Sequence, residues 1–182
     1  FGHYGDHLRH IVDIIGKAKG VLDVSALSTL ILPGGTFFLC DTQVTYDPTA
    51  EELVEMTVLA VDAIRRFGET PKVAMLSHSN FGAASTPSAE KMRRAVRILR
   101  KRAPDLEVEG EMQGDAAVNP DIRQRLFPNS KLKGSANLLI LPNLDAANAA
   151  FNLLKALGSG LQVGPMLLGT AQPAHILAPS VT

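Results

Sequence analysis

The sequence has little cysteine, no net charge and no long apolar run, and each of these absences excludes a class of protein. Its one cysteine, Cys40, excludes an internal disulfide framework and fits a reducing compartment, so a cytoplasmic location is expected. The chain has 18 basic and 18 acidic residues, which leaves no overall field to hold nucleic acid or an anionic membrane. No apolar run approaches the roughly 20 residues that span a bilayer. We therefore expect neither nucleic acid nor a membrane as a partner.

The two ends of the sequence indicate how the chain relates to a longer protein. Residues 1–4 lack the basic region followed by an apolar stretch that defines a signal peptide. The first residue is not methionine, and the chain stops at Thr182 in the middle of a polar–apolar pattern, so we expect a fragment of a longer protein. With 182 residues, of which 46% are hydrophobic and 20% charged, the composition is ordinary for a soluble globular protein of one large or two small domains.

The spacing of apolar residues predicts strands that alternate with helices. Apolar residues recur at helical spacing over 8–15, 50–67, 87–102, 120–126 and 145–157, and short apolar runs predict strands over 27–32, 36–40, 72–77, 106–112, 137–141 and within 161–170. This alternation predicts an α/β domain with a largely parallel central sheet, made mixed by the hairpin strand 36–40. Strand 106–112 alternates apolar and acidic residues, so one of its faces is expected to be wet.

Four polar segments are expected at the carboxyl ends of strands, where open α/β sheets bind their ligands. They are 77–82, 112–115, 142–145 and 164–166. The first has two serines, an asparagine and a glycine before a helix, so its N–H groups are candidates for holding a phosphate, with a plain capped connection as the alternative. It matches neither a Walker loop nor a dinucleotide fingerprint. His78 is not expected as a catalytic base for its neighbouring serines, because adjacent strand residues point to opposite faces.

The titratable residues give weaker candidates. Asp115 and Asp145 form a candidate carboxylate pair, although Asp145 is favoured as a helix cap and Asp115 can simply satisfy loop amides. His7 and His10 lie one helical turn apart, but no carboxylate follows at matching spacing, so no metal site is expected. The basic run 93–102 is favoured as a solvated helix face, and the alternative is attraction of an acidic ligand such as the phosphates of coenzyme A.

Five stretches, in order and over nearly the whole chain, resemble the phosphate acetyl/butyryl transferase family. They are residues 47–53, 71–77, 110–117, 141–144 and 164–166. The resemblance implies a three-layer α/β/α fold with a mixed, largely parallel sheet, similar to isocitrate and isopropylmalate dehydrogenases, and an active site in the cleft between two subdomains. It makes residues 21–170 the second α/β subdomain, residues 1–20 a helix that belongs to or links from the first, and residues 171–182 a return segment toward the first.

One departure from the family decides the expected function. Active members have a run similar to Pro-Val-Asn-Asp-Leu-Ser-Arg-Gly, whose Ser and Arg serve binding and catalysis, and Ala178 and Pro179 take their places here. Loss of the guanidinium removes bidentate phosphate recognition and stabilisation of transition-state charge, so no catalytic residue is expected. Residues 175–182 instead resemble the transferase-like tail of hybrid, multimodular malic enzymes, as do residues 7–11 and 27–33.

The malic-enzyme resemblance implies a non-catalytic regulatory and oligomerisation domain that senses acetyl-CoA. Its expected partners are acetyl-CoA or a related acyl-CoA, the protein's own malic-enzyme domain and at least one further copy of the chain. NAD(P) and Mg or Mn are expected in the malic-enzyme part, which lies outside this chain, and no cofactor within it. The alternatives are an active phosphate acetyltransferase and a structural module that binds nothing. The resemblance places these residues at the acetyl-CoA pocket: Arg9, Ser77, Ser79, Asn80, Gln113, Asp115, Pro142, Asn143, Gly164 and Pro165.

Overall fold

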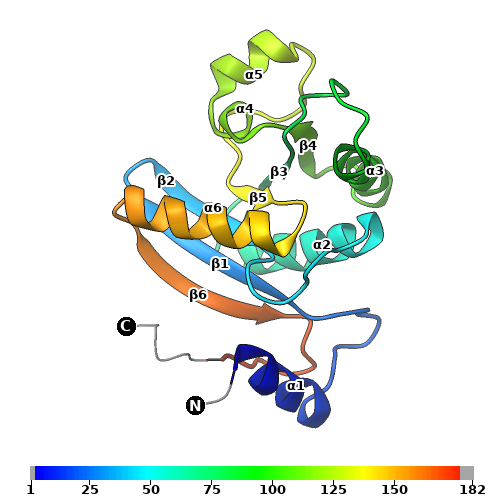
Figure 1. The fold of residues 1–182 in the computed structure, drawn as a ribbon, viewed down its shortest axis with the longest axis vertical. Helices are drawn as coiled ribbons and strands as arrows, with labels where there is room; N and C mark the ends of the chain where they lie inside the picture. The colour runs from blue at the N-terminus through cyan, green and yellow to red at the C-terminus, as the bar shows by residue number, and fades with distance from the viewer. Residues whose placement is uncertain (1–2, 177–182) are drawn as a thin grey trace.

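A computed structural model describes residues 3–176 of the chain, in which helices and strands alternate (Figure 1). The elements are α1 (Tyr4–Ile14), β1 (Ser25–Leu32), β2 (Gly35–Cys40), α2 (Ala50–Arg66), β3 (Lys72–Leu76), α3 (Pro87–Arg102), β4 (Glu107–Met112), α4 (Gly114–Val118), α5 (Pro120–Leu126), β5 (Leu138–Ile140), α6 (Leu144–Leu157) and β6 (Leu161–Leu168). The short helix α4 is the one element that the apolar spacing did not predict within this range. Among the described residues, no helix is both long enough and apolar enough to cross a bilayer.

The strands form one mixed sheet with the order β4-β3-β5-β2-β1-β6. Strands β4, β3, β5 and β2 pair in parallel, whereas β1 pairs antiparallel with both β2 and β6. The predicted mixed, largely parallel sheet is confirmed, and so is the hairpin of strands 27–32 and 36–40. The reversed strand of this hairpin is β1 rather than strand 36–40, which is β2 and runs parallel to β5, a strand about a hundred residues later in the chain.

Helices cover both faces of the sheet, so the three-layer α/β/α arrangement is confirmed (Figure 1). One apolar core packs α2 and α3 against the sheet, and its buried residues include Leu53, Ile64 and Met92. A second core joins α4 and α6 to the other face, through residues such as Ala116 and Phe151. Because β4, β3, β5 and β2 run parallel, their carboxyl ends meet at one edge of the sheet, where the polar loops begin.

Helix starts follow local capping chemistry. Thr49 begins α2, where its hydroxyl accepts the Glu52 N–H at 3.2 Å and the Glu52 carboxylate accepts the Thr49 N–H at 2.7 Å. The predicted capping role of Asp145 is wrong. Asn143 is the cap of α6, since its Oδ1 accepts the Ala146 N–H at 2.9 Å, and Asp145 lies in the first turn of the helix.

Strand β4 does not have the wet face that its alternating pattern predicted. Glu109 and Glu111 are 1% and 0% exposed, and they form ion pairs with Arg100 and Arg93 of α3. The register with β3 is irregular here, and the irregularity needs a glycine: Gly110 has φ +141°, and a Cβ at this position would lie 2.6 Å from the Met75 carbonyl oxygen. The carboxylates are buried because a neighbouring helix supplies their counter-charges.

Helix α1 has no fully buried residue, although the Tyr4 hydroxyl is enclosed. Two backbone hydrogen bonds just beyond its end join it to the segment after β6: Ala18 N–H to Gly169 at 2.8 Å, and Ala171 N–H to Gly16 at 2.9 Å. Figure 1 shows α1 beside the end of β6, at the opposite end of the molecule from α4 and α5. The assignment of residues 1–20 to another subdomain stays a prediction.

Candidate functional site

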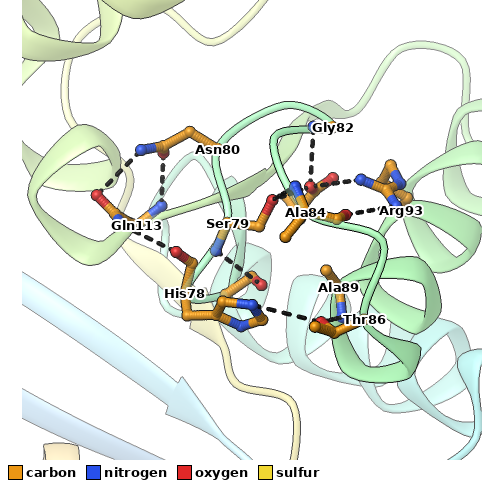
Figure 2. A network of polar contacts seen from close by, with 11 residues as sticks. His78, Ser79, Asn80, Gly82, Ala84, Thr86, Ala89, Arg93 and Gln113 are labelled. Carbon is orange, nitrogen blue, oxygen red and sulfur yellow. Dashed lines mark hydrogen bonds and ion pairs between the residues drawn. The ribbon is translucent and has the colours of Figure 1, made fainter.

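The candidate site is the loop from residue 77 to 86, which connects β3 to α3, together with Gln113 at the end of β4 (Figure 2). Strands β3 and β4 are parallel neighbours, so the segments that follow them leave the same edge of the sheet side by side. The structure thus brings together Ser77, Ser79, Asn80 and Gln113, which the resemblance placed in one pocket.

A buried carboxylate that the sequence did not single out lies at the centre of this loop. The Oε1 atom of Glu111 accepts hydrogen bonds from the Ser79 hydroxyl at 2.8 Å, the Gly82 N–H at 2.9 Å and the Arg93 guanidinium at 2.9 Å. Its Oε2 atom is also buried and has no hydrogen-bond partner within the described part of the chain. The Glu111–Arg93 pair is therefore a buried ion pair that also fixes a loop.

Several backbone N–H groups of the loop, from Ser79 to Ala84, are already used inside the protein. The Phe81 N–H binds the Glu111 carbonyl at 2.7 Å, and the Ala83 N–H binds the Asn80 carbonyl at 3.0 Å. The Ser79 N–H donates to Ser77 Oγ at 3.2 Å, and the Ala84 N–H donates to Ser79 Oγ at 3.0 Å (Figure 2). These N–H groups are not free to hold a phosphate, so the structure favours the capped connection over the phosphate cradle for them.

The outer side of the loop is a rim of polar side chains. The side-chain amide of Asn80 donates to Gln113 Oε1 at 3.0 Å, and Asn80 Oδ1 accepts the Gln113 N–H at 2.8 Å. The Gln113 side chain also donates to the His78 carbonyl at 2.9 Å, and the His78 ring lies 3.3 Å from the Thr86 hydroxyl (Figure 2). His78 and Gln113 are exposed and Asn80 is half-buried, so this rim can hydrogen-bond to a ligand.

The other predicted residues lie outside the loop 77–86. Asp115 is exposed in the first turn of α4, where it accepts the N–H of the next residue at 2.8 Å, and Asp145 lies in the first turn of a different helix, α6. Pro142 and Asn143 follow β5 at the same sheet edge. Gly164 and Pro165 were expected in a loop after a strand, and this placement is wrong because they lie inside β6.

Arg9 is not brought together with the loop. It lies on α1, its side chain is 69% exposed, and its nearest acidic partner is Asp6 at 3.7 Å. Figure 1 shows α1 well separated from the segment that joins β3 to α3. Ala178 and Pro179, which carry the predicted loss of catalysis, lie outside the described residues. The basic run 93–102 is partly neutralised, since Arg93, Arg94 and Arg100 each pair with a glutamate.

A second polar cluster that the sequence analysis missed lies after β2. Asp41 is 4% exposed, and its carboxylate accepts the N–H groups of Gln43, Val44 and Thr45 at 2.9, 3.1 and 3.0 Å. Burial raises the pKa of Asp41 above the usual value, against the opposing effect of these hydrogen bonds. Burial, and then the nearby Asp41 charge, raise the pKa of Tyr4 to about 12. An aspartate directly after an apolar run was the signal available in the sequence.

A small hollow also lies at this edge of the sheet. A cavity of about 240 Å³ opens between the loop after β2 and the start of α6, and it is lined by Thr42, Gln43, Leu144, Asp145, Asn148 and Ala149. This volume is below the roughly 300–1,000 Å³ of a complete ligand pocket. Within residues 3–176, no three histidine, cysteine, aspartate or glutamate side chains cluster as metal ligands would.

Comparison with known proteins finds a family match over the whole chain and relatives of two kinds, malic enzymes and phosphate acetyltransferases. The family model of phosphate acetyl/butaryl transferase matches residues 1–182. A NAD-dependent malic enzyme of Rhizobium meliloti (strain 1021) is 55% identical over 181 residues, which cover 100% of this chain and 24% of that enzyme. A phosphate acetyltransferase of Paracoccus denitrificans is 37% identical over 180 residues, which cover 95% of this chain and 57% of that protein.

A solved structure has the same fold. The EutD phosphotransacetylase from Staphylococcus aureus superposes with a TM-score of 0.89 at 31% identity, over 97% of this chain and 55% of that one. The chain therefore spans about a quarter of the malic enzyme and just over half of the phosphotransacetylase.

Proposed function

The chain belongs to the phosphate acetyl/butaryl transferase family and corresponds to the transferase-like part of malic enzymes, and we propose that it is a regulatory and oligomerisation domain without transferase activity. Its ligand in this proposal is acetyl-CoA, which it binds in a degenerate transferase cleft. The activity that it regulates is the oxidative decarboxylation of malate to pyruvate by another part of the same protein. NAD(P) and the divalent metal belong to that other part.

One observation carries the proposal: the whole chain matches a malic enzyme at 55% identity while covering only 24% of it. A transferase-like segment attached to an enzyme that acts on malate can serve as its sensor of an acyl compound. Binding and catalysis depend on different groups, so a domain can lose the second and keep the first. The polar rim of His78, Asn80 and Gln113 offers amide donors and acceptors suited to the amide groups of coenzyme A.

Two features support the absence of transferase chemistry. The N–H groups of Ser79, Gly82 and Ala84 and the Ser79 hydroxyl are bound to protein acceptors, which leaves these groups poorly suited to inorganic phosphate. The sequence has Ala178 and Pro179 where the family has its Ser and Arg. Without a guanidinium fork, neither the phosphate nor the developing charge of the transition state has its counterpart.

The Arg9 guanidinium is the proposed contact for a phosphate of coenzyme A, because it can donate two parallel hydrogen bonds to phosphate oxygens. Arg9 and the rim lie apart in the chain described here (Figure 1). Coenzyme A is an extended molecule with its phosphates far from its thiol end, so it can contact two separate places. The proposed site has Arg9 at one end and Ser77, Ser79, Asn80, Gln113, Asp115, Pro142 and Asn143 at the other, and it also includes Gly164 and Pro165 of β6.

Exposed apolar residues favour self-association. Leu153, Leu157 and Leu161 are 61%, 83% and 65% exposed, and they lie on α6 and at the start of the edge strand β6. Exposed apolar groups that lie near one another are typical of interfaces, and a homodimer is the commonest closed symmetry. Light scattering at micromolar concentration should therefore give at least twice the mass of one chain, and a monomeric mass would contradict the oligomerisation role.

The second candidate function is an active phosphate acetyltransferase, since the relative of that name from Paracoccus denitrificans is 37% identical. Calorimetry with acetyl-CoA, followed by an assay of acetyl phosphate formation from acetyl-CoA and phosphate, separates the candidates. We expect binding without turnover. Robust turnover would establish the transferase, and absence of both would leave the structural module.

A further inference from the structure

The loop between β3 and α3 is fastened at one buried carboxylate that the proposed function does not use. We infer that Glu111 is the positioning residue of the candidate site: it sets the shape of residues 77–84 and so holds His78 and Asn80 against Gln113 for the ligand. The inference rests on the proposed function for the identity of that ligand, acetyl-CoA. The shape of the loop can be measured without it.

The first step is the concentration of donors on one atom. Glu111 Oε1 receives the Ser79 hydroxyl, the Gly82 N–H and the Arg93 guanidinium, all at 2.8–2.9 Å. Hydrogen bonds to an ionised acceptor are roughly twice as strong as neutral ones. Ser79 and Glu111 are 3% and 0% exposed, so water does not replace the bond between them in the folded chain. Without the carboxylate, the buried serine hydroxyl loses its acceptor, and the exposed Gly82 loses the bond that holds it against the strand.

The second step is a relay to the far end of the loop. The Ser79 hydroxyl that donates to Glu111 also accepts the Ala84 N–H at 3.0 Å. The Arg93 guanidinium that pairs with Glu111 also donates to the Ala84 carbonyl at 2.9 Å (Figure 2). Both ends of the segment from Ser79 to Ala84 are thus tied to one carboxylate, so its position follows that of Glu111.

The third step connects this anchor to the rim. Gln113 lies two residues after Glu111, and it binds Asn80 and the His78 carbonyl from the same strand end. These outer contacts are exposed or half-buried, and hydrogen bonds that compete with water contribute little by themselves. The rim therefore keeps its geometry because the buried bonds to Glu111 hold the loop beneath it. The competing anchor is Phe81, which stacks on Phe127 with a centroid distance of 4.4 Å.

The experiment removes both partners of the ion pair, because removing one alone leaves an uncompensated buried charge. The variant is Glu111→Leu with Arg93→Met in the full-length protein. Its matched control is Glu109→Leu with Arg100→Met, which removes a second pair of a buried glutamate and an arginine between the same strand and helix. The Glu109 carboxylate binds Arg100, the N–H of Gly110 and the N–H of Lys131, and within the described residues it has no hydrogen bond to residues 77–84.

Hydrogen–deuterium exchange of the peptide over residues 77–86 and calorimetry with acetyl-CoA are the two measurements. In the Glu111 and Arg93 variant we expect at least tenfold faster exchange in this peptide and at least tenfold weaker acetyl-CoA binding, and in the control we expect neither. Glu111→Gln, which keeps the side-chain shape and removes the charge, should change both in the same direction by less, and it decides the matter if the double variant does not fold.

Unchanged exchange in both Glu111 variants would overturn the inference, and Phe81 would then be the anchor of the loop. Faster exchange with unchanged acetyl-CoA binding would overturn the positioning role. Equal effects in the control would also overturn it, because they would reflect a general loosening of the strand. Absence of acetyl-CoA binding by the wild type would contradict the proposed function instead, and the exchange rates would still show whether Glu111 sets the loop.

Discussion

Arg123 is the side chain whose removal should destabilise this fold most clearly. It lies on α5, is 2% exposed and forms no ion pair within the described residues. Its guanidinium donates to the carbonyl oxygens of Ala116 and Ala117 at the end of α4, at 2.9 and 3.2 Å. It also donates to the carbonyl of Leu132, at 3.1 Å, and to that of Gly134. One side chain therefore joins α4 and the segment before β5.

The cost of Arg123→Ala follows from these four acceptors. A buried carbonyl that loses its donor costs about 1–3 kcal/mol. The four costs do not add, because one group serves all of them and water can enter the space that it leaves. We take about 3–5 kcal/mol, which lies between the cost of one unsatisfied carbonyl and the sum for four. For a chain of this size, this corresponds to a melting temperature lowered by roughly 6–20 °C.

Urea unfolding of the chain, followed by circular dichroism, measures this cost through the midpoint at an unchanged slope. Arg123→Lys should recover less than half of the loss, because a point-like ammonium cannot reach two segments as the planar guanidinium does. The control is Arg125→Ala, an exposed residue of the same helix, which should stay within about 0.5 kcal/mol of wild type. If Arg123→Ala also stays within about 1 kcal/mol, the reasoning from its buried bonds is refuted.

Two further predictions concern Gly110 and Asp41. Gly110→Ala should lower the free energy of unfolding by about 2–3 kcal/mol, because its Cβ would meet the Met75 carbonyl. The control Gly114→Ala, which has open space around its Cβ, should change this free energy by less than about 1 kcal/mol. Equal effects of the two substitutions in urea unfolding would contradict the prediction. Burial raises the pKa of Asp41 above 3.8 in the folded chain, which then binds the proton more tightly than the unfolded chain does. The quantity to compare is the free energy of unfolding of wild type minus that of Asp41→Asn. This difference should fall as the pH rises from below the unfolded pKa of Asp41 through its raised folded pKa, and a difference that rises with pH would contradict the prediction.

Local chemistry made much of the fold predictable. The capping box of Thr49 and Glu52 lies within four residues, and it fixed the start of α2. The hairpin of β1 and β2 also depends on a short turn. The direction of β2 relative to the other parallel strands was predicted wrongly because its partner, β5, lies about a hundred residues later. Pattern within a segment identifies a strand, but long-range pairing decides its neighbours.

The burial of Glu109 and Glu111 was missed for the same reason. Alternating acidic residues predict a solvated face unless a remote segment supplies counter-charges, and here α3 supplies Arg93 and Arg100. The site was predictable as a set of loops, since Asn80 and Gln113 each follow an apolar strand. Their direct contact, and the carboxylate beneath them, depend on strand order, which no local pattern contains.

The central claim is that this domain senses acetyl-CoA for the malic-enzyme part, and malate turnover by the full-length protein tests it most directly. Turnover is measured with and without acetyl-CoA for wild type, for Arg9→Ala and for the control Arg125→Ala. A typical coupling of about 1–3 kcal/mol predicts a change of roughly 5- to 150-fold in the wild type and in the control, and none in Arg9→Ala. A response in Arg9→Ala equal to that of wild type would move the phosphate contact elsewhere, and a wild type indifferent to acetyl-CoA would contradict the claim itself.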